Sequence, residues 1–187
     1  MKNFFHKNWS NILFFGIIVL LIFPQTRVPI QVFVTRLISF SPSETAQEDQ
    51  QLINSLDWSL VTIEGESINL ASSEGNVILI NLWATWCPPC IAEMPSLQNL
   101  YNDYKYSVDF YFPSSEEKEI LQMFLQKKGY TFPVYRFNEQ PPLQLQSQSI
   151  PATFVISKKG EIVIKKIGPA DWDSEKVRGI LDRLVAE

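Results

Sequence analysis

The sequence predicts an α/β domain with a central mixed β-sheet flanked by helices, and two patterns carry this prediction. From about residue 56 onward, short segments of β-type alternation are interspersed with segments of helical periodicity, which is typical of parallel β-α-β units. Closer to the C-terminus, two β-type segments follow each other across a tight turn, which adds antiparallel strands. The 187 residues suffice for one such domain and an appendage, and a hydrophobic content of 45% suffices for a buried core.

The predicted elements follow one another closely. Two short strands around Gly65 predict an N-terminal β-hairpin extension. The stretch Val77–Trp83 is almost wholly apolar, as in a central strand that is buried on both faces. Pro113 is expected to end the strand before it, because proline cannot donate a ladder hydrogen bond. Strands are expected at 58–63, 67–70, 77–83, 108–112, 132–135, 152–157 and 161–166, and helices at 89–104, 116–128 and 174–185.

The N-terminal segment has the pattern of an export signal. Residues 1–11 include Lys2 and Lys7 and form a basic start, expected to be cytoplasmic, and the apolar run from residue 12 closes at Pro24. No small-residue cleavage pattern follows this run, so residues 12–24 are interpreted as an uncleaved signal anchor. A cleaved signal peptide stays an alternative, since the run is short for a spanning helix.

Residues 25–40 and 41–55 connect this anchor to the domain. In the first segment, apolar residues recur at helical spacing, which predicts an amphipathic helix in the membrane interface or, equally, one packed on the domain or a partner chain. These residues are Ile30, Phe33, Val34, Leu37 and Ile38. The second segment is polar and acidic and is interpreted as a linker, so that the folded domain is expected over residues 56–187.

Charge and cysteine content exclude several classes of protein. The net charge is −4, with 16 basic residues and 20 acidic residues, and no clustered positive excess indicates nucleic-acid binding. Both cysteines lie in the sequence Trp86-Cys87-Pro88-Pro89-Cys90. The lone histidine, His6, precedes the apolar run, so we expect no metal site within the chain. No cofactor is expected either.

The Cys87–Cys90 pair indicates thiol–disulfide chemistry. The two residues are three apart at the start of a predicted helix, so one turn brings their side chains onto the same face. Cys87 would lie at the helix N-terminus, where unpaired N–H groups and the helix dipole stabilise a thiolate. We therefore predict that Cys87 is the nucleophile and that Cys90 resolves the mixed disulfide. An inert structural disulfide is the alternative, although so small a loop constrains the unfolded chain little.

The stretch from Ile80 to Pro95, which contains WCPPC followed by Glu93 and Pro95, resembles the active-site segment of TlpA/ResA-type thioredoxin-like proteins. A second similar block is Ile150–Ile156, and the resemblance extends over roughly residues 56–185. It implies a thioredoxin-like fold and a thiol–disulfide oxidoreductase that is anchored in a membrane.

The resemblance also implies roles for residues around the cysteines. Pro151 is expected to follow a cis peptide bond and to face the disulfide, whereas an ordinary trans proline is the alternative. Glu93 is expected to tune cysteine ionisation or to transfer protons, unless it is a solvated surface carboxylate. Asn81 stands where thioredoxin has a buried aspartate, and an amide cannot serve as a general base. Substrate docking is assigned to Trp86, Pro88, Pro89, Ile150 and Pro151.

Three functions are compatible with this sequence. The first is a reductant of disulfides in exported proteins, with apocytochrome c among its candidate substrates and a membrane electron donor as partner. The second is an oxidant that installs disulfides through the same residues. The third is a copper-binding thioredoxin-fold module, since thiolates bind copper(I) well. The expected location is the bacterial inner membrane, as a single-pass protein whose catalytic domain faces the periplasm.

Overall fold

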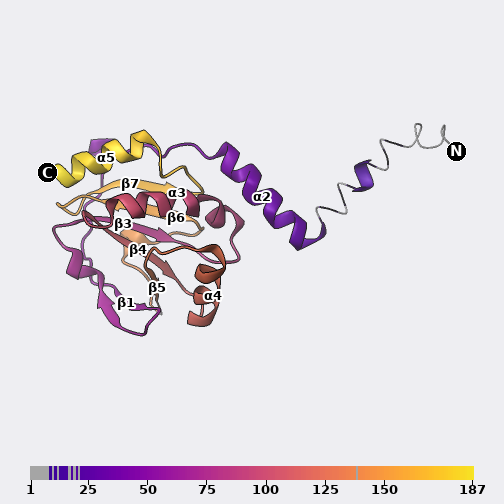
Figure 1. The fold of residues 1–187 in the computed structure, drawn as a ribbon. Coiled ribbons are helices and arrows are strands. Elements are labelled where there is room, and N and C mark those ends of the chain that lie inside the picture. The colour runs from indigo at the N-terminus through magenta and orange to yellow at the C-terminus, as the bar shows by residue number, and fades with distance from the viewer. Residues whose placement is uncertain are drawn as a thin grey trace.

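The computed structural model describes residues 22–137 and 139–187, together with residues 9, 11, 13–16, 18 and 20. The described residues form a seven-stranded mixed sheet with the order β2-β1-β5-β4-β3-β6-β7 (Figure 1). Its strands are β1 (Ser59–Thr62), β2 (Ser67–Asn69), β3 (Val77–Leu82), β4 (Val108–Ser114), β5 (Val134–Arg136), β6 (Ala152–Ile156) and β7 (Ile162–Ile167). The α-helices are α2 (Pro24–Ile38), α3 (Pro88–Tyr104), α4 (Lys118–Lys128) and α5 (Glu175–Ala186), and short 3-10 helices are η1 (Gln47–Asp49), η2 (Leu70–Ser73) and η3 (Leu143–Leu145).

The strand pairing confirms the predicted mixed sheet and its N-terminal hairpin. Strands β3, β4 and β5 run parallel to one another, with α3 and α4 as the crossover connections. Strand β6 pairs antiparallel with β3 and with β7, and the β1–β2 hairpin joins the other side of the sheet by antiparallel pairing with β5. The carboxyl end of β3, at the centre of the sheet, leads directly into the loop that carries the cysteines.

Alternating side chains of the strands build a core on each face of the sheet. Val77 and Leu79 of β3 point into a core that α3, α4 and α5 cover, while Ile78 and Ile80 point into the opposite core, beside Trp58. Each fully buried aliphatic side chain of this size contributes about 1.5–3 kcal/mol to folding. Strand β3 is therefore buried on both faces, as its apolar sequence predicted.

The expectation that Pro113 ends its strand is wrong. Strand β4 continues to Ser114, and Pro113 itself pairs in register with Tyr135 of β5. The carbonyl of Pro113 faces β3 and accepts a hydrogen bond from the N–H of Trp83. An N–H at residue 113 would point to the same side. It would lie beyond Ile80 and Tyr111, the last β3–β4 register pair, so the ladder between these strands needs no donor there.

The expected linker at 41–55 lies along the sheet edge that β7 forms. The N–H of Thr45 donates to the carbonyl of Val163 over 2.8 Å, and the N–H of Ile162 donates to the carbonyl of Gln51 over 2.9 Å. Its backbone therefore covers an edge strand that would otherwise expose unpaired N–H and C=O groups. These contacts are made by main-chain atoms, so the polar side chains of the segment gave no sign of them.

Residues 1–8 and 10 of the expected basic N-terminus lie outside the described residues, as do residues 12, 17, 19 and 21 of the expected anchor at 12–24. Among the residues that the structure describes, no helix combines the length and apolar character needed to cross a membrane. The predicted amphipathic segment is helical as α2, which ends at Ile38.

Candidate active site

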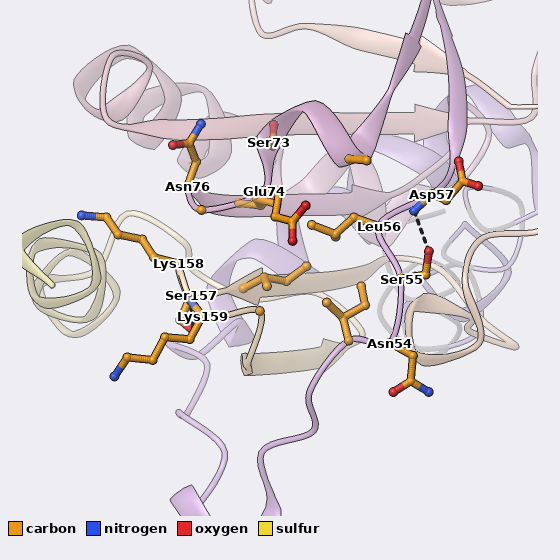
Figure 2. A pocket seen from close by; sticks show the side chains of 16 residues that line it. Asn54, Ser55, Leu56, Asp57, Ser73, Glu74, Asn76, Ser157, Lys158 and Lys159 are labelled. Carbon is orange, nitrogen blue, oxygen red and sulfur yellow. Dashed lines mark hydrogen bonds between the residues drawn. The ribbon is translucent and has the colours of Figure 1, made fainter.

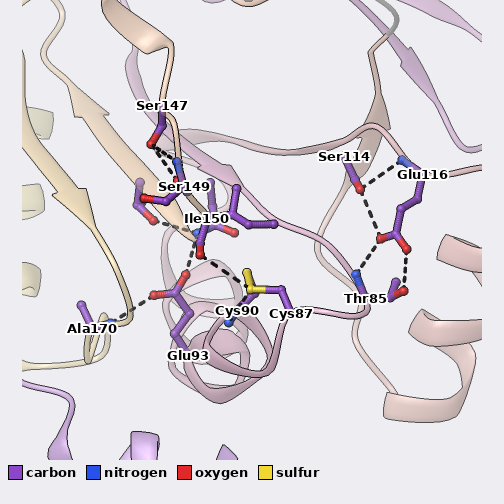
Figure 3. Close-up of a disulfide and its surroundings, with 12 residues drawn as sticks. Thr85, Cys87, Cys90, Glu93, Ser114, Glu116, Ser147, Ser149, Ile150 and Ala170 are labelled. Atoms are coloured by element: carbon purple, nitrogen blue, oxygen red, sulfur yellow. Dashed lines mark hydrogen bonds between the residues drawn. A yellow bond between two sulfur atoms is a disulfide. The ribbon is translucent and has the colours of Figure 1, made fainter.

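The two cysteines form a disulfide at the N-terminus of α3 (Figure 3). Cys87 is the N-cap residue of the helix, and Pro88 and Pro89 occupy its first turn, where a missing N–H costs little. The Cys87 Sγ atom accepts a hydrogen bond from the N–H of Cys90 over 3.2 Å. The same N–H and the helix dipole would stabilise a thiolate at Cys87 after reduction. Both cysteines are buried in the oxidised protein, with Cys87 3% and Cys90 0% exposed.

The segment Ile150–Pro151, directly ahead of β6, lies next to the disulfide. The peptide bond between Ile150 and Pro151 is cis, as expected, and Pro151 directly precedes β6. The carbonyl oxygen of Ile150 lies 3.8 Å from Cys87 Sγ. The structure therefore brings together four of the residues that sequence analysis assigned to the site: Cys87, Cys90, Ile150 and Pro151.

Glu93 lies one turn after Cys90 and is buried, which excludes a solvated surface carboxylate. Its Oε2 atom accepts hydrogen bonds from the indole Nε1 of Trp172 (3.0 Å) and from the N–H of Ala170 (3.1 Å). Its Oε1 atom accepts one from Asn81 Nδ2 over 2.8 Å. Burial raises the pKa of Glu93 from 4.5 to about 7, because desolvation of the charged form outweighs the three donors.

Asn81 connects Glu93 to the sheet. It is buried on β3 and pairs across the sheet with Thr153 of β6, whose hydroxyl accepts a second hydrogen bond from Asn81 Nδ2 over 2.7 Å. The carbonyl oxygen Oδ1 of Asn81 is buried without a partner. If this amide turned over, Oδ1 could accept a hydrogen bond from a protonated Glu93. Asn81 can therefore accompany a change of charge at Glu93, although it takes up no proton itself.

Sequence analysis missed Glu116, which fastens the loop before Cys87 (Figure 3). Its carboxylate accepts hydrogen bonds from the backbone N–H of Thr85 (2.6 Å) and from the Thr85 hydroxyl (2.7 Å). Glu116 was expected as the first residue of a helix, but α4 begins at Lys118 with Glu117 as N-cap. An acidic residue near a helix start is so common that nothing in the sequence pointed to a contact 31 residues away.

Aromatic residues next to the cysteines take two different positions. Trp86 is 71% exposed beside Cys87, which suits a docking surface. Trp83 is buried, and its indole N–H donates to the carbonyl of Phe112 over 3.1 Å. Sequence analysis also missed Trp172, which reaches Glu93 from the loop that precedes α5.

A hollow of about 350 Å³ (Figure 2) lies at the opposite end of the sheet from the disulfide. Gly75 and Asn76, which precede β3, and the β6–β7 turn at Lys158–Gly160 line it. None of the residues assigned to the site borders this hollow. Within the described part of the chain, no group of three or more His, Cys, Asp or Glu side chains is placed to hold a metal ion.

Comparison with known proteins agrees with this geometry. The Redoxin family profile matches residues 47–181. Thiol-disulfide oxidoreductase ResA of Halalkalibacterium halodurans is 33% identical over 66% of this chain and 70% of the relative. Sporulation thiol-disulfide oxidoreductase A of Bacillus subtilis is 27% identical over 75% of this chain and 88% of the relative.

The fold is also shared with a solved structure. The crystal structure of StoA from Bacillus subtilis superposes with a TM-score of 0.53 at 28% identity, over 70% of this chain and 96% of that one. The residues that the Redoxin profile matches include the cysteine pair, strand β3 with Asn81, and Pro151 ahead of β6. The chain therefore belongs to the Redoxin family, as a thioredoxin-fold thiol–disulfide oxidoreductase.

Proposed function

We propose that this oxidoreductase is a membrane-anchored reductant that opens disulfides in exported proteins. The single observation that carries the mechanism is the placement of Cys87 at the N-cap of α3, with the N–H of Cys90 directed at its sulfur. In the reduced protein the same placement favours the thiolate at Cys87 and so selects it as the attacking group.

The reaction balances as two successive exchanges. The Cys87 thiolate attacks one sulfur of the substrate disulfide, forms a mixed disulfide and expels the other substrate sulfur as a thiolate, which takes up a proton. The Cys90 thiolate then attacks Cys87 Sγ, releases the second substrate thiol and leaves the Cys87–Cys90 disulfide seen here. A membrane dithiol donor would return the electron pair for the next cycle.

Glu93 is proposed to move the proton that Cys90 must lose. It lies three residues after Cys90 on α3, and a pKa of about 7 lets it exist in both charge states near neutral pH. The buried Glu93–Asn81 pair would take the place of the buried aspartate of thioredoxin, because Asn81 cannot accept the proton.

The docking surface would consist of exposed Trp86 and half-buried Pro88 and Pro89 on one side of the disulfide and Ile150–Pro151 on the other. The Ile150 carbonyl, 3.8 Å from Cys87 Sγ, supports this arrangement. An extended substrate segment could pair with the backbone ahead of β6 while its cysteine meets Cys87. Cysteine pairs of apocytochrome c fit this requirement, as do other exported cysteine pairs.

The proposed location is the bacterial inner membrane, with residues 12–24 as a single-pass anchor and the domain of residues 56–187 in the periplasm. The basic residues before the apolar run support this orientation. Export also suits a chain whose two cysteines are joined in a disulfide.

The reduction potential of the Cys87–Cys90 pair tests the direction of the reaction. It is measured by equilibrating the full chain in redox buffers and scoring reduced thiols by alkylation. A value near that of thioredoxin, roughly −270 mV, is expected for a reductant. A value near that of DsbA, roughly −120 mV, would make the protein an oxidant and overturn the proposed direction.

A further inference from the structure

Charge is divided unevenly along the chain. No acidic residue precedes Glu44, whereas Lys2, Lys7, Arg27 and Arg36 lie in that stretch. The remaining residues carry the other 12 of the 16 basic residues and all 20 acidic ones, so they have a formal charge of −8. An anionic surface attracts such a basic segment, whereas it does not attract the acidic domain.

Helix α2 carries exposed apolar side chains along one side. The residues Ile30, Phe33, Val34 and Leu37, here called the outer stripe, recur at helical spacing. All four are exposed, and Phe33 and Leu37 are 63% and 68% exposed. So large an apolar stripe on a folded protein indicates a covering surface that the chain itself does not provide.

The other side of α2 rests against the start of α3. Half-buried Thr35 borders a groove with Pro88 and Pro89, the two residues between the cysteines, and so do the exposed residues Arg27, Gln31 and Ile38. Further along, Arg36 and Ser39 border a second groove with Pro95 of α3. Figure 1 shows α2 at the end of the sheet where α3 begins, so this helix lies next to the disulfide.

We propose that α2 lies flat on an anionic lipid bilayer, with the outer stripe in the acyl boundary and with Arg27 and Arg36 near the lipid phosphates. Two features favour lipid over a protein partner. The apolar run of residues 12–23 leads directly into the helix, and the whole segment before Glu44 lacks acidic residues. A helix of 15 residues extends about 22 Å along the surface at about 1.5 Å per residue.

This placement deepens the proposed function and rests on it. Because the inner side of α2 faces Pro88 and Pro89 across a groove, a helix held in the bilayer surface holds the Cys87–Cys90 pair close to that surface. Substrates whose disulfides lie near the membrane then meet the pair at a raised local concentration. The substrate class is therefore disulfides of membrane-associated chains, in preference to freely diffusing ones.

Spin labels on the full chain in vesicles of phosphatidylethanolamine and phosphatidylglycerol test the placement. Labels are attached to Phe33→Cys, Leu37→Cys and Met123→Cys while the Cys87–Cys90 pair is oxidised and therefore unreactive. Met123 is the matched control, since it is 63% exposed on α4. Labels at 33 and 37 are expected to collide with lipid-soluble oxygen and to be shielded from a water-soluble nickel chelate, and the label at 123 should do the reverse.

Two results would overturn the bilayer placement. Labels at 33 and 37 that behave like the label at 123 would leave the stripe in water, and shielding from both reagents would mean that a protein covers it. Activity is measured separately, with the double variant Phe33→Glu/Leu37→Glu and the control Met123→Glu. The double variant should reduce a vesicle-tethered disulfide about tenfold more slowly and a soluble disulfide at the unaltered rate.

Equal rates of all three proteins on the tethered disulfide would contradict the substrate preference. If the unaltered protein reduces neither disulfide, the proposed reductant function fails, and the label positions still decide whether α2 lies on the bilayer.

Discussion

The buried carboxylate of Glu93 accepts a hydrogen bond from the indole N–H of Trp172 over 3.0 Å, across the interface between α3 and the loop before α5. This contact joins the helix that carries the cysteines to the C-terminal part of the domain. The same hydrogen bond favours the charged form of Glu93 and so lowers its pKa, but burial outweighs it and raises the pKa to about 7.

Glu93 should make the stability of the oxidised protein depend on pH. The folded protein keeps a proton that the unfolded chain releases above its usual pKa of 4.5, so the free energy of unfolding should fall as the pH rises from 4.5 to about 7. The total loss should be about 3 kcal/mol. Urea unfolding across this range measures it. Glu93→Gln should remove most of this pH dependence, whereas Glu119→Gln, on the exposed side of α4, should keep it. Equal pH dependence in all three proteins would contradict its assignment to Glu93.

Trp172→Phe should weaken the protein most where Glu93 is charged. The ring is retained in part but the donor is lost, so the free energy of unfolding should decrease by about 1.5–3 kcal/mol above neutral pH, and the pKa of Glu93 should rise further. Trp58→Phe is the matched control, since Trp58 is equally buried but its Nε1 has no partner. Urea unfolding at about pH 8 compares the two. A loss as large in Trp58→Phe would mean that ring volume, and not the hydrogen bond, determines the effect.

Glu116→Gln should loosen the loop that presents Cys87. The neutral amide keeps one accepting oxygen for the Thr85 N–H, and its NH2 group can meet the Thr85 hydroxyl only if that hydroxyl reverses and accepts. Both bonds lose the charge of the carboxylate, at a cost of about 1–2 kcal/mol in the free energy of unfolding. The neighbouring Glu117 pairs with Arg136 at the surface, and Glu117→Gln should cost less than about 1 kcal/mol. Exchange turnover should decrease only in the Glu116 variant. Equal effects of the two substitutions on stability and turnover would refute a specific role of Glu116.

Cys90→Ala should trap substrates as mixed disulfides. The thiolate of Cys87 is retained at the N-cap, but no second thiol is left to release the substrate. Non-reducing electrophoresis of membranes that contain this variant should show adducts that a thiol reductant dissolves. Cys87→Ser should give neither adducts nor turnover, and adducts with that variant would reverse the assigned roles.

The sequence predicted the fold and the centre of the site because both follow from local patterns. The apolar β3 strand, the helix start at the cysteines and the Ile150–Pro151 block are each recognisable within a few residues. Glu116 and Trp172 were missed because their partners lie 31 and 79 residues away and are brought close only by the fold. Pro113 was misjudged for a related reason, since the ladder partner that a strand needs depends on its neighbours in the sheet.

Asn81→Asp should turn the buried pair into two acids that share one environment. Asn81 Nδ2 now donates to Glu93 Oε1 over 2.8 Å, and an aspartate of nearly the same shape would place a second carboxylate there. Two carboxylates at this separation cannot both be charged at low cost, so one of them should hold a proton at neutral pH, and the pair should titrate as a unit. The variant should be close to the unaltered protein in stability at about pH 5 and should lose stability as the pH rises to about 8, more steeply than the unaltered protein does.

Thr153→Val, which removes the other partner of Asn81 and adds no acid, should lower the stability equally at both pH values. Urea unfolding of the three oxidised proteins distinguishes these outcomes, and a parallel loss in both variants would mean that Asn81 acts only through packing and not through the charge of Glu93.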